Sequence, residues 1–580
     1  MKKLLLGNAA VAQGAYEAGV KFVSSYPGTP STEITECMAT YSADDVFVEW
    51  APNEKVAAEA VVGAAIAGGR SMSCCKHVGL NVMADAIFTD SYIGVNGGAV
   101  FCVADDPGMH SSQNEQDSRH YARAAKIPML EPSDSSECLN FTKLAFDLSE
   151  QFDTPVFVRL STRVSHSQSL VEVGEREEHT VKPYEKNIPK HVMMPAMAKA
   201  RHVLVEERTK KLIEYAETSA LNVCENNGAK IGVITAGISY EYAKEALGDQ
   251  VNYLKLGMVW PISENLIRNF VNSCDKVYVI EELDPFIENE CRALGLNVYG
   301  KDLFTMLGEY TPAMIRSVVL GENGPACTNP EEVLPNRPPV LCPGCPHRGT
   351  FYVLKKLGLT VSGDIGCYTL GAVAPLASVD TTICMGASIS AAHGMAKVQG
   401  SAFNKKLVSV IGDSTFMHSG ITALSDIVYN KGANTVIILD NSITGMTGHQ
   451  DNPTTGKTIR GEATRQVDLI KLCGALGVEH VTVCDPFDVK AFEKIVREET
   501  ARDDVSVIIA QRPCALLKSV KYEGHCEITE ACRKCKLCMK LGCPAISVHD
   551  DGTVHIDVTQ CNGCGLCVGV CPFSAIRKVN

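Results

Sequence analysis

Two cysteine-rich runs near the C-terminus constrain the fold of this chain more than any other feature. The first is CRKCKLCMKLGCP, Cys532 to Pro544, and the second is CNGCGLCVGVCP, Cys561 to Pro572. A run of the form C-x2-C-x2-C-x3-C-P gives three thiolates to one [4Fe-4S] cluster and its fourth to a second cluster, so such runs normally come in pairs. The second run has this spacing, and the first has one extra residue before its last cysteine. The chain therefore has to fold two sets of thiolates around two clusters.

The crossed pattern predicts the members of each set. One cluster takes Cys532, Cys535, Cys538 and Cys571, and the other takes Cys561, Cys564, Cys567 and Cys543. Structural zinc usually takes two ligand pairs rather than triplets closed by Cys-Pro, and disulfides need an oxidising compartment. The spacing favours two clusters over both alternatives. Residues 520–580 are thus predicted to form a ferredoxin-like α+β domain that conducts electrons.

Composition and the N-terminal sequence indicate a reducing compartment. The chain has 25 cysteines in 580 residues, and its start, MKKLLLGNAAVAQGAYEAGV, has polar residues within its apolar run. This start is typical of a strand followed by a helix rather than of a secretory signal. No apolar stretch is long enough to span a bilayer. We expect a cytoplasmic protein without a membrane segment, and the net charge of −13 argues against nucleic acid as a partner.

A local cluster of basic residues stands out near the cysteine runs. Two interpretations remain open at this point: a docking face for an acidic electron carrier, or ordinary solubilising charge. The basic residues are Lys518, Lys521, Arg533, Lys534, Lys536 and Lys540.

Short β-rich runs recur between helical stretches along the rest of the chain. Near-continuous apolar strands that alternate with helices are typical of parallel sheets covered on both faces. Charge-rich segments near 172–192 and 320–340 separate three α/β blocks, roughly 1–190, 225–320 and 335–515, from the cluster domain. The predicted strands are 99–105, 155–160, 231–235, 276–282, 407–412, 435–440 and 505–511.

The third block contains a candidate magnesium site. The predicted strand 407–412 runs into Asp413, and the strand 435–440 ends next to Asn441, with Ile443 just beyond. Carboxylate, amide and carbonyl oxygens are ligands that Mg²⁺ prefers, and it shares its other positions with phosphate and water. Such sites lie at the carboxyl ends of parallel strands, where a glycine lets a pyrophosphate approach. Two strand-end turns without a metal are the alternative interpretation.

The sequence around these residues resembles the diphosphate motif of thiamine diphosphate enzymes. The resemblance implies that Asp413, Asn441 and the Ile443 carbonyl hold Mg²⁺, and that Gly412 and Ser414 also contact the cofactor. The usual third residue of the motif is glycine, so Ser414 puts the tightness of the turn in question while leaving the metal ligands intact.

Thiamine enzymes also need a carboxyl group that exchanges a proton with the aminopyrimidine ring of the cofactor. Such a carboxyl should lie in a dry helical setting. The stretch EWAPNEKVAAEAVVGAAIAGG offers Glu54 at a helix start, followed by small residues, and Glu59 further inside the same helix as a competitor. A carboxylate at a helix start also has a purely electrostatic explanation.

Nearly the whole chain resembles the 2-oxoacid:ferredoxin oxidoreductases, and most closely their arylpyruvate-specific members. Any one of the matching strings is weak, and their number and order are strong. They are SYPGTPSTE (25–33), WAPNEKVA (50–57), KHVGLN (76–81), DDPGMHSSQNEQDSR (105–119), LKLGMVWPI (254–262), EELDPFIE (281–288), CPGCPHRGTF (342–351), GDIGCYTLG (363–371), IGDSTFMHSG (411–420) and the cysteine runs.

This resemblance implies roles for further residues. Glu54 is the cofactor-activating carboxylate, and Thr29 and Arg119 hold the carboxylate of the substrate, for which a hydroxyl and a guanidinium are suited. For Arg119, a surface ion pair is the alternative. The family also has a proximal [4Fe-4S] cluster with a similar cysteine pattern, here Cys342, Cys345, Cys367 and Cys514. A dithiol redox pair or half of a zinc site are the alternatives for the first two.

The resemblance further implies an architecture and an activity. Residues 1–190 bind the pyrimidine ring, 225–320 form a transketolase C-terminal-like domain, and 335–515 bind diphosphate and magnesium. The activity is oxidative decarboxylation of an arylpyruvate such as indolepyruvate with coenzyme A, with ferredoxin as acceptor and a smaller beta subunit in an α2β2 assembly. A non-oxidative thiamine decarboxylase or synthase, and an electron-transfer subunit without its own catalytic site, are the alternatives. The remaining cysteines, Cys526 among them, show no ligand spacing and are expected to be small buried hydrophobic residues.

Overall fold

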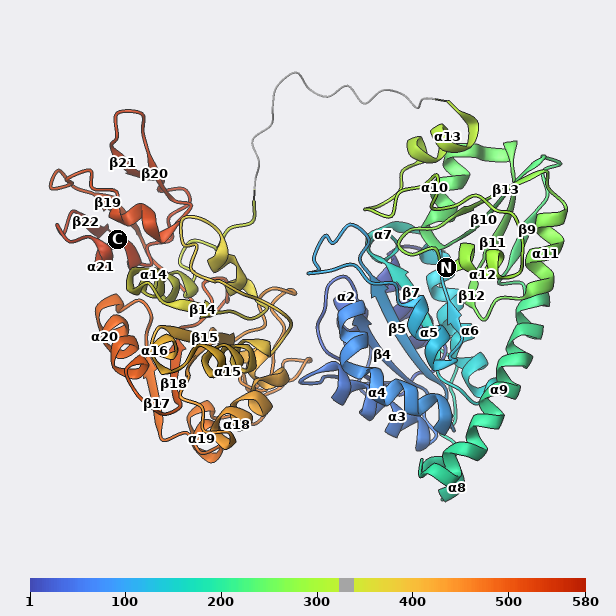
Figure 1. The fold of residues 1–580 in the computed structure, drawn as a ribbon, viewed down its shortest axis with the longest axis horizontal. Coiled ribbons are helices and arrows are strands. Elements are labelled where there is room, and N and C mark those ends of the chain that lie inside the picture. Colours follow the sequence, from blue (N-terminus) through green and yellow to red (C-terminus); the bar gives the residue numbers. More distant parts are fainter. Residues whose placement is uncertain (323–337, 580) are drawn as a thin grey trace. The chain divides into compact units, whose positions relative to one another are not determined.

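The computed structural model describes residues 1–322 and 338–579, which divide into two compact units (Figure 1). The first unit is Met1–Glu331 and the second is Glu332–Asn580. Residues 323–337 lie outside the described residues. Most of the predicted boundary segment 320–340 and the predicted domain start at residue 335 fall within this range.

The first unit is built on a seven-stranded sheet with the order β12-β6-β7-β5-β4-β2-β3. All neighbouring strands are parallel except β12, which runs antiparallel to β6. Its central strands are almost fully buried, which explains why β5 is apolar along nearly its whole length. The strands are β2 (Phe22–Ser25), β3 (Phe47–Trp50), β4 (Ser71–Lys76), β5 (Ala99–Asp105), β6 (Met129–Leu130), β7 (Val156–Ser161) and β12 (Met258–Trp260).

Helices connect these strands and cover the sheet. Several of them, α3 and α6 included, begin where a side chain accepts a hydrogen bond from the first turn: Asn53 Oδ1 accepts from Val56 N at 2.9 Å, and Asp134 Oδ1 accepts from Glu137 N at 2.8 Å. A short antiparallel pair, β1 (Lys2–Leu6) and β8 (Gln168–Glu172), lies beside the sheet. The helices are α1 (Gly7–Glu17), α2 (Thr32–Met38), α3 (Glu54–Ile66), α4 (His77–Ile93), α5 (Arg119–Ala125), α6 (Ser135–Phe152), α7 (Thr162–His166), α8 (Ile188–His191) and α9 (Pro195–Thr218).

A second sheet of the first unit has the order β13-β10-β11-β9. One hydrophobic core contains residues of both sheets, including Phe101, Phe157, Ile234 and Val277, so the two sheets pack as one body. The strands are β9 (Val223–Glu225), β10 (Ile231–Ala236), β11 (Asn252–Leu256) and β13 (Lys276–Ile280). The helices are α10 (Gly237–Leu247), α11 (Glu264–Asn272), α12 (Phe286–Ala293) and α13 (Pro312–Leu320).

The second unit contains a five-stranded parallel sheet with the order β14-β15-β16-β18-β17. The strands are β14 (Thr360–Ser362), β15 (Leu407–Gly412), β16 (Thr435–Asp440), β17 (His480–Cys484) and β18 (Ser506–Gln511). The helices are α14 (His347–Leu357), α15 (Ala387–Gln399), α16 (Ser401–Asn404), α17 (Asp413–Thr415), α18 (Ile421–Tyr429), α19 (Leu469–Ala475) and α20 (Val489–Thr500), with a π-helix at Phe416–Gly420.

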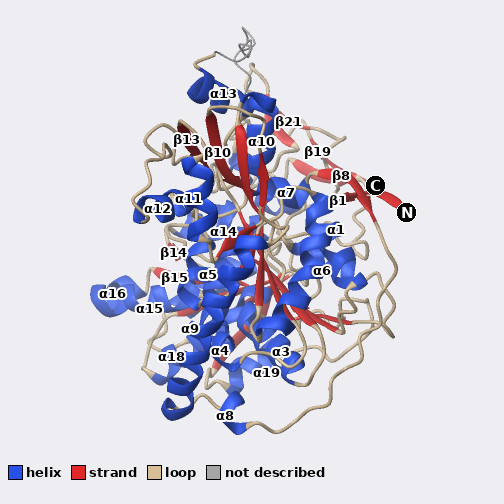
Figure 2. Cartoon of the chain, turned by 90° about the vertical axis from the view of Figure 1, so that its right-hand side faces the viewer, coloured by secondary structure: helices blue, strands red, loops and turns tan. Residues whose placement is uncertain are grey.

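The cysteine-rich tail follows this sheet in the same unit. It has two antiparallel strand pairs, β19 (His525–Ile528) with β22 (Ile576–Val579) and β20 (Ile546–Val548) with β21 (Val554–Ile556), and the short helix α21 (Leu566–Val570). One hydrophobic core runs from Phe351 and Val408 through Cys538 to Ile576, so the tail is packed against the sheet domain. The predicted fold class, parallel α/β with a ferredoxin-like α+β domain, is confirmed (Figure 2).

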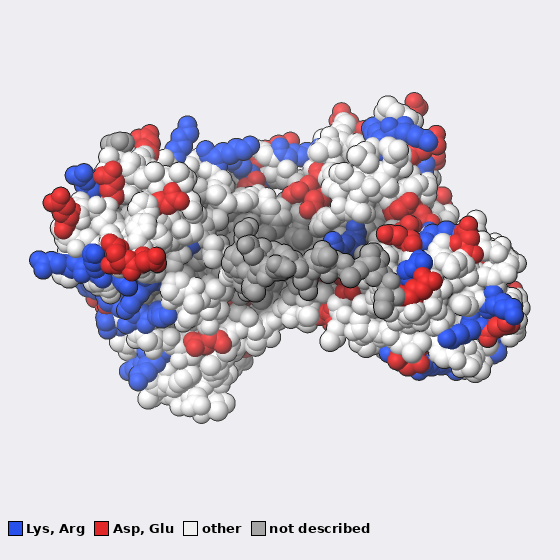
Figure 3. Space-filling view, turned by 90° about the horizontal axis from the view of Figure 1, so that it is seen from above, with Lys and Arg blue, Asp and Glu red and all other residues white. Residues whose placement is uncertain are grey.

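The predicted strands are present close to their predicted bounds, and the N-terminal segment is a strand followed by a helix. On the face drawn in Figure 3, basic and acidic side chains are interspersed. Among the helices of the described residues, none combines the length and the apolar character that crossing a membrane requires.

Candidate functional site

The carboxyl ends of the parallel strands of the first unit gather the first group of predicted residues. Thr29 follows β2, Glu54 follows β3 and Arg119 lies beyond β5. Because neighbouring parallel strands end at the same edge of a sheet, the loops after them meet there. The loops after β2 and β5 are joined by a hydrogen bond from Ser111 Oγ to the Thr29 carbonyl oxygen at 3.2 Å.

Burial distinguishes the two candidate carboxylates of α3. Glu54 is 4% exposed at the first position of the helix. Glu59, one turn further on, is on the surface and pairs with Lys55. A Cβ atom at Gly79 of α4 would lie 2.6 Å from Glu54 Oε1, so the missing side chain of Gly79 makes the space that the Glu54 carboxyl group fills. The geometry favours Glu54 as the carboxylate in a dry helical setting.

Lys76 is a further cation at this edge that the sequence analysis did not single out. It is the last residue of β4, and burial lowers the pKa of its ammonium group. Its Nζ donates to the carbonyl oxygen of Ser111 at 2.8 Å, and its side chain lies within 3.4 Å of the position that a Gly28 Cβ would take. Lys76 therefore lies beside the loop that carries Thr29. The only sequence signal was its place in the KHVGLN string.

Arg119 lies in a buried ion-pair network. Its side chain is 1% exposed, and its Nη1 donates to Glu281 Oε2 at 2.6 Å. Its Nε donates to Asp117 Oδ1 at 2.9 Å. Burial opposes ionisation of Asp117, but the charges of Arg119 and Arg159 hold the pKa of this carboxyl group below its usual range. Because its side chain is buried, Arg119 does not form a surface ion pair. A substrate carboxylate would have to displace one of these partners to reach the guanidinium group.

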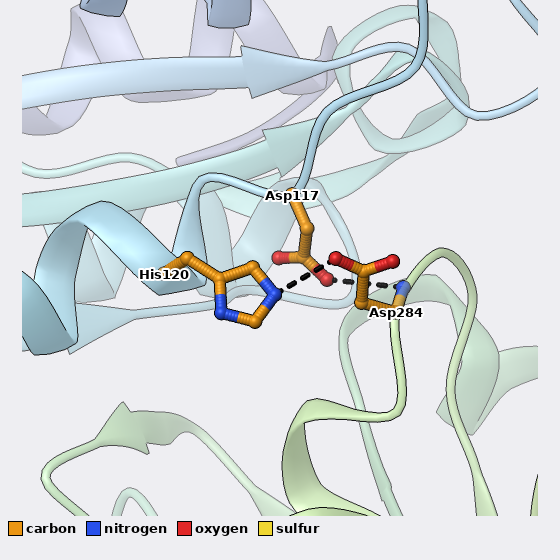
Figure 4. A group of neighbouring side chains, drawn as sticks. All are labelled: Asp117, His120 and Asp284. Carbon is orange, nitrogen blue, oxygen red and sulfur yellow. Dashed lines mark hydrogen bonds and ion pairs between the residues drawn. The ribbon is translucent and has the colours of Figure 1, made fainter.

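Two half-buried neighbours extend this network outward. Figure 4 shows His120 Nε2 at 2.8 Å from Asp284 Oδ2, and the Asp284 backbone N–H donates to Asp117 Oδ2 at 3.3 Å. The three side chains are close enough to share a cation. The guanidinium charge of Arg119 against Asp117 opposes a second cation at the same carboxylate.

In the second unit, three oxygen atoms converge at the ends of β15 and β16. The amide oxygen of Asn441 faces Asp413 Oδ1 at 3.1 Å and the carbonyl oxygen of Ile443 at 2.8 Å. Neighbouring ligands of an octahedral Mg²⁺ with bonds of about 2.1 Å lie about 3 Å apart, so this spacing suits the ion. Rotation of the amide by 180° would instead let its NH₂ group donate to both oxygens. The donor set fits the predicted magnesium ligands.

Asp413 lies in surroundings that favour a cation. Its side chain is 2% exposed, and burial together with the neighbouring carboxylate of Asp440 raises its pKa to about 7. Thr454 Oγ1 donates to Asp413 Oδ2 at 3.0 Å, which fixes the carboxyl group. A buried carboxylate of this kind is costly without a positive partner, and a bound divalent cation removes that cost.

The turn after β15 answers the question raised by Ser414. Ser414 is not among the residues with positive φ, so the turn does not require glycine at this position. Its Oγ accepts a hydrogen bond from Thr444 Oγ1 at 2.9 Å. Close packing instead favours glycine two residues earlier, because a Cβ atom at Gly412 would lie 2.7 Å from Cε1 of Tyr368.

The four cysteines predicted to hold a proximal cluster come together in the second unit. The charge of Cys514 acts on Cys367, and that of Cys342 acts on both Cys367 and Cys514. Burial raises the pKa of Cys345 to about 12 and that of Cys367 to about 11. Thiols of this kind are inert without a metal, whose charge stabilises the thiolates.

This cysteine group borders the predicted magnesium loop. A Cβ atom at Gly445 would lie 3.4 Å from Cys367 Sγ and 3.8 Å from Asn441 Nδ2. The backbone N–H of Cys514 donates to the carbonyl oxygen of Asn441 at 2.9 Å. The predicted proximal cysteines therefore lie next to the predicted magnesium ligands.

The tail contains two small cavities whose walls match the crossed ligand sets. The first is lined by Cys532, Cys535, Cys538 and Cys571. The second is lined by Cys543, Cys561, Cys564 and Cys567. Spacing alone had separated the last cysteine of each run from its own triplet, and the cavities separate them in the same way.

A fifth cysteine, Cys526 of β19, also lines the second cavity. It is 1% exposed, and its backbone N–H donates to Cys561 Sγ at 3.3 Å. Because Cys526 lies outside both runs, its sequence position predicts only that it is buried as a small hydrophobic residue. Val554 of β21 lines the first cavity. The second cavity therefore has a fifth thiol in its wall, and among the described residues the first cavity has only its four predicted cysteines.

Comparisons with known proteins agree with this geometry. Residues 13–231 match the family model of the thiamine diphosphate-binding domain of pyruvate flavodoxin/ferredoxin oxidoreductase. Residues 364–510 match the C-terminal TPP-binding domain of thiamine pyrophosphate enzymes, and residues 554–577 match the 4Fe-4S binding domain. The chain thus has domains that bind thiamine diphosphate and an iron–sulfur cluster.

Curated relatives match this chain over almost its whole length and over almost their own whole length. The IorA subunit of indolepyruvate oxidoreductase from Archaeoglobus fulgidus is 41% identical over 99% of this chain and 97% of the relative. The IorA subunits from Pyrococcus horikoshii and Methanothermobacter thermautotrophicus are each 39% identical, over 100% and 99% of this chain and 97% of each relative. Two sheet domains with thiamine diphosphate family signatures, a tail that holds cysteine cages, and this identity lead to one conclusion: the chain belongs to the IorA family of indolepyruvate oxidoreductase subunits, and it is a 2-oxoacid:ferredoxin oxidoreductase.

Proposed function

We propose that the chain oxidatively decarboxylates an arylpyruvate, indolepyruvate above all, and that coenzyme A takes up the acyl group. The products are an aryl-acyl-CoA and CO₂, and two electrons pass through [4Fe-4S] clusters to ferredoxin. The observation that carries this proposal is the four-cysteine group beside the magnesium loop. A non-oxidative decarboxylase would need no electron acceptor at that position.

The predicted site residues have separate tasks in this proposal. When bound, thiamine diphosphate supplies the carbanion chemistry that breaks the bond between the carboxylate and the keto carbon. Asp413, Asn441 and the Ile443 carbonyl hold Mg²⁺, and Gly412 and Ser414 line the approach of the diphosphate. Glu54 holds and returns a proton at its carboxyl oxygen, because α3 and Gly79 keep that group buried and in one place.

Thr29 and a neighbouring cation hold the substrate carboxylate. The resemblance implies Arg119 for the cation, and we propose Lys76 as a second candidate because its ammonium group lies beside the Thr29 loop and is free of a carboxylate partner within 4 Å among the described residues. Lys76 and Arg119 differ in what else depends on them. Arg119 neutralises two buried carboxylates, and Lys76 donates only to a backbone carbonyl in the contacts described above.

We also propose three clusters, four domains and two partners. The proximal cluster binds to Cys342, Cys345, Cys367 and Cys514, and the tail holds the two crossed sets. The domains are those predicted from the sequence, 1–190, 225–320, 335–515 and 520–580. The partners are a smaller beta subunit in an α2β2 assembly and a ferredoxin. Support comes from the cavities of the tail and from the name of the relatives, which are subunits.

An anaerobic assay tests the proposed function. The chain is purified with its partner subunit, iron and thiamine are counted, and indolepyruvate, coenzyme A and a low-potential dye are added. We expect about twelve irons per chain, as three four-iron clusters require, and dye reduction that depends on coenzyme A. Release of CO₂ without dye reduction would instead identify a non-oxidative decarboxylase. Replacing indolepyruvate with 2-oxoglutarate or pyruvate tests the aryl preference.

The Gly79→Ala substitution should reduce activity without unfolding the protein. The new methyl group would lie 2.6 Å from Glu54 Oε1 and would push the carboxyl group from its place. Displacement of a proton-transferring group by about 1 Å costs about 10²-fold in rate, so we expect a fall of that order in kcat. Gly63→Ala is the matched control: it lies in α3, and its Cβ would meet no atom within 4 Å. Wild-type kcat in Gly79→Ala would contradict the role of Glu54.

Substitutions of Lys76 and Arg119 should separate substrate binding from folding. We expect Lys76→Met to raise KM for the 2-oxoacid about tenfold or more, the effect of losing one charge-assisted hydrogen bond, with little change in Tm. Arg119→Met leaves Glu281 buried without its cation and leaves Asp117 only the more distant Arg159 at 3.8 Å, and loss of one partner of a buried pair costs about 3–5 kcal/mol of unfolding free energy. An unchanged KM in Lys76→Met, with a raised KM in a folded Arg119→Lys protein, would assign the carboxylate to Arg119.

Cysteine substitutions should reveal which sulfur atoms of the second tail cavity bind iron. Cys526→Val should keep about twelve irons per chain, because the four other cysteines complete a [4Fe-4S] site. Cys561→Ala should lose about four irons by the same count. Cys473→Ala, at a buried cysteine of α19, controls for substitution of a buried thiol. A loss of four irons in Cys526→Val would make Cys526 a ligand and would overturn the predicted set.

A further inference from the structure

Arg348 is a buried arginine in the second unit. It is the second residue of α14, and its side chain is 2% exposed. Its guanidinium group donates only to backbone carbonyl oxygens in the contacts that the structure records: Nε to Cys342 at 3.0 Å, Nη1 to Leu541 at 2.9 Å and to Gly542, and Nη2 to Leu341. Among the residues that the structure describes, no carboxylate lies within 4 Å of this cation.

A buried cation without an anion is energetically unfavourable. Removing a charge from water costs several kcal/mol even after relaxation, and hydrogen bonds to carbonyls repay only part of this. An arginine side chain does not escape the cost by losing its proton. The first turn of a helix is a further disadvantage, because the positive end of the helix dipole repels a cation there. The position of Arg348 therefore calls for a negative group.

The surroundings of Arg348 identify that group. Arg348 lines the second tail cavity together with Cys543, Cys561, Cys564 and Cys567, and the Cys342 carbonyl oxygen accepts a hydrogen bond from Arg348 Nε at 3.0 Å. These cysteines belong to the proposed proximal set and to the second tail set. The missing anion is thus a cluster with thiolate ligands.

The loop between Cys342 and Cys345 brings the same two sets together. Pro343 and Gly344 line the second tail cavity, and Asn562 Nδ2 donates to the Pro343 carbonyl oxygen at 3.1 Å. Gly344 has φ +73°, and a Cβ atom there would lie 2.4 Å from Asn562 Nδ2. The loop of the proximal cysteines is therefore pressed against the loop that carries Cys561 and Cys564.

We propose that Arg348 is the fixed counter-charge of the cluster held by Cys543, Cys561, Cys564 and Cys567, and that it raises the reduction potential of this cluster. The inference rests on the proposed cluster assignment. When bound, this cluster would gain one negative charge on accepting one electron from the proximal cluster, which would be oxidised by one electron. Since net charge near a cluster sets its potential, a buried cation would stabilise the reduced form.

The first tail cavity supplies a matched control. Arg533 lines that cavity beside Cys532 and Cys535, and its side chain is exposed. A charge in contact with water is screened far more than a buried one. Arg348→Met and Arg533→Met each remove one arginine charge from the wall of one tail cavity, and they differ in burial.

The test is a redox titration of the complete, anaerobically purified assembly, followed by electron paramagnetic resonance and accompanied by iron analysis. We expect Arg348→Met to lower the reduction equilibrium constant of one cluster by about tenfold or more, which is about 59 mV per tenfold for a one-electron couple. Arg533→Met should shift no cluster by as much. Equal potentials in wild type and Arg348→Met, or an equal or larger shift in Arg533→Met, would overturn the proposal.

Arg348→Lys covers the case in which the methionine variant does not retain its iron. If the lysine variant keeps its clusters when the methionine variant loses four irons, the positive charge is what the site needs, as proposed. Loss of iron from both would show that the hydrogen-bonding geometry of the guanidinium group holds the loops together, and would overturn the counter-charge role. A wild-type protein without two tail clusters would refute the proposed function itself, before any variant is compared.

Discussion

Sulfur atoms from distant segments have to converge in the second unit, and the rest of its structure depends on this convergence. Cys342 and Cys345 precede α14, Cys367 follows β14, and Cys514 follows β18, the last strand of the sheet. A parallel sheet suits this task because its strands end at one edge, where the connecting loops meet. The same edge carries Asp413 and Asn441, so the sheet that gathers the sulfur atoms also gathers the predicted magnesium ligands.

Close packing around glycine is the second recurring device. Gly79 leaves space for the Glu54 carboxyl group, Gly412 for the Tyr368 ring, and Gly344 for Asn562. In each case the glycine has no Cβ atom, and a side chain from another segment occupies the space that a Cβ atom would need. The positions of these three side chains therefore depend on glycine in the segment packed against them.

Periodicity was sufficient to identify the strands, and the cysteine sets predicted from spacing are grouped in the same way by the two tail cavities. Strands such as 407–412 and 435–440 are buried on both faces, so most of their positions are apolar, and these apolar runs identify them. The cavities of the tail follow the cysteine spacing because cluster geometry permits little else. The sequence could not show whether serine is acceptable at position 414. Ser414 does not have a positive φ, so the departure from the motif does not strain the turn.

Contacts between distant segments could not be predicted. The choice between Glu54 and Glu59 depended on which face of α3 is covered by α4, and the strength of the Arg119 network depended on Glu281, which is 162 residues away in the chain. Lys76, Cys526 and Arg348 had no spacing that marked them. Their surroundings come from other loops and strands, and a single sequence contains no record of those neighbours.

The hydrophobic core that continues from the parallel sheet into the tail has a consequence for how electrons travel. Phe351 and Val408 belong to the same core as Cys538 and Ile576, so the tail is packed on the sheet domain and is not joined to it by a tether alone. In the proposed function, the separation between successive clusters would therefore be set by folding, and no domain movement would be needed to carry electrons from the sheet domain into the tail.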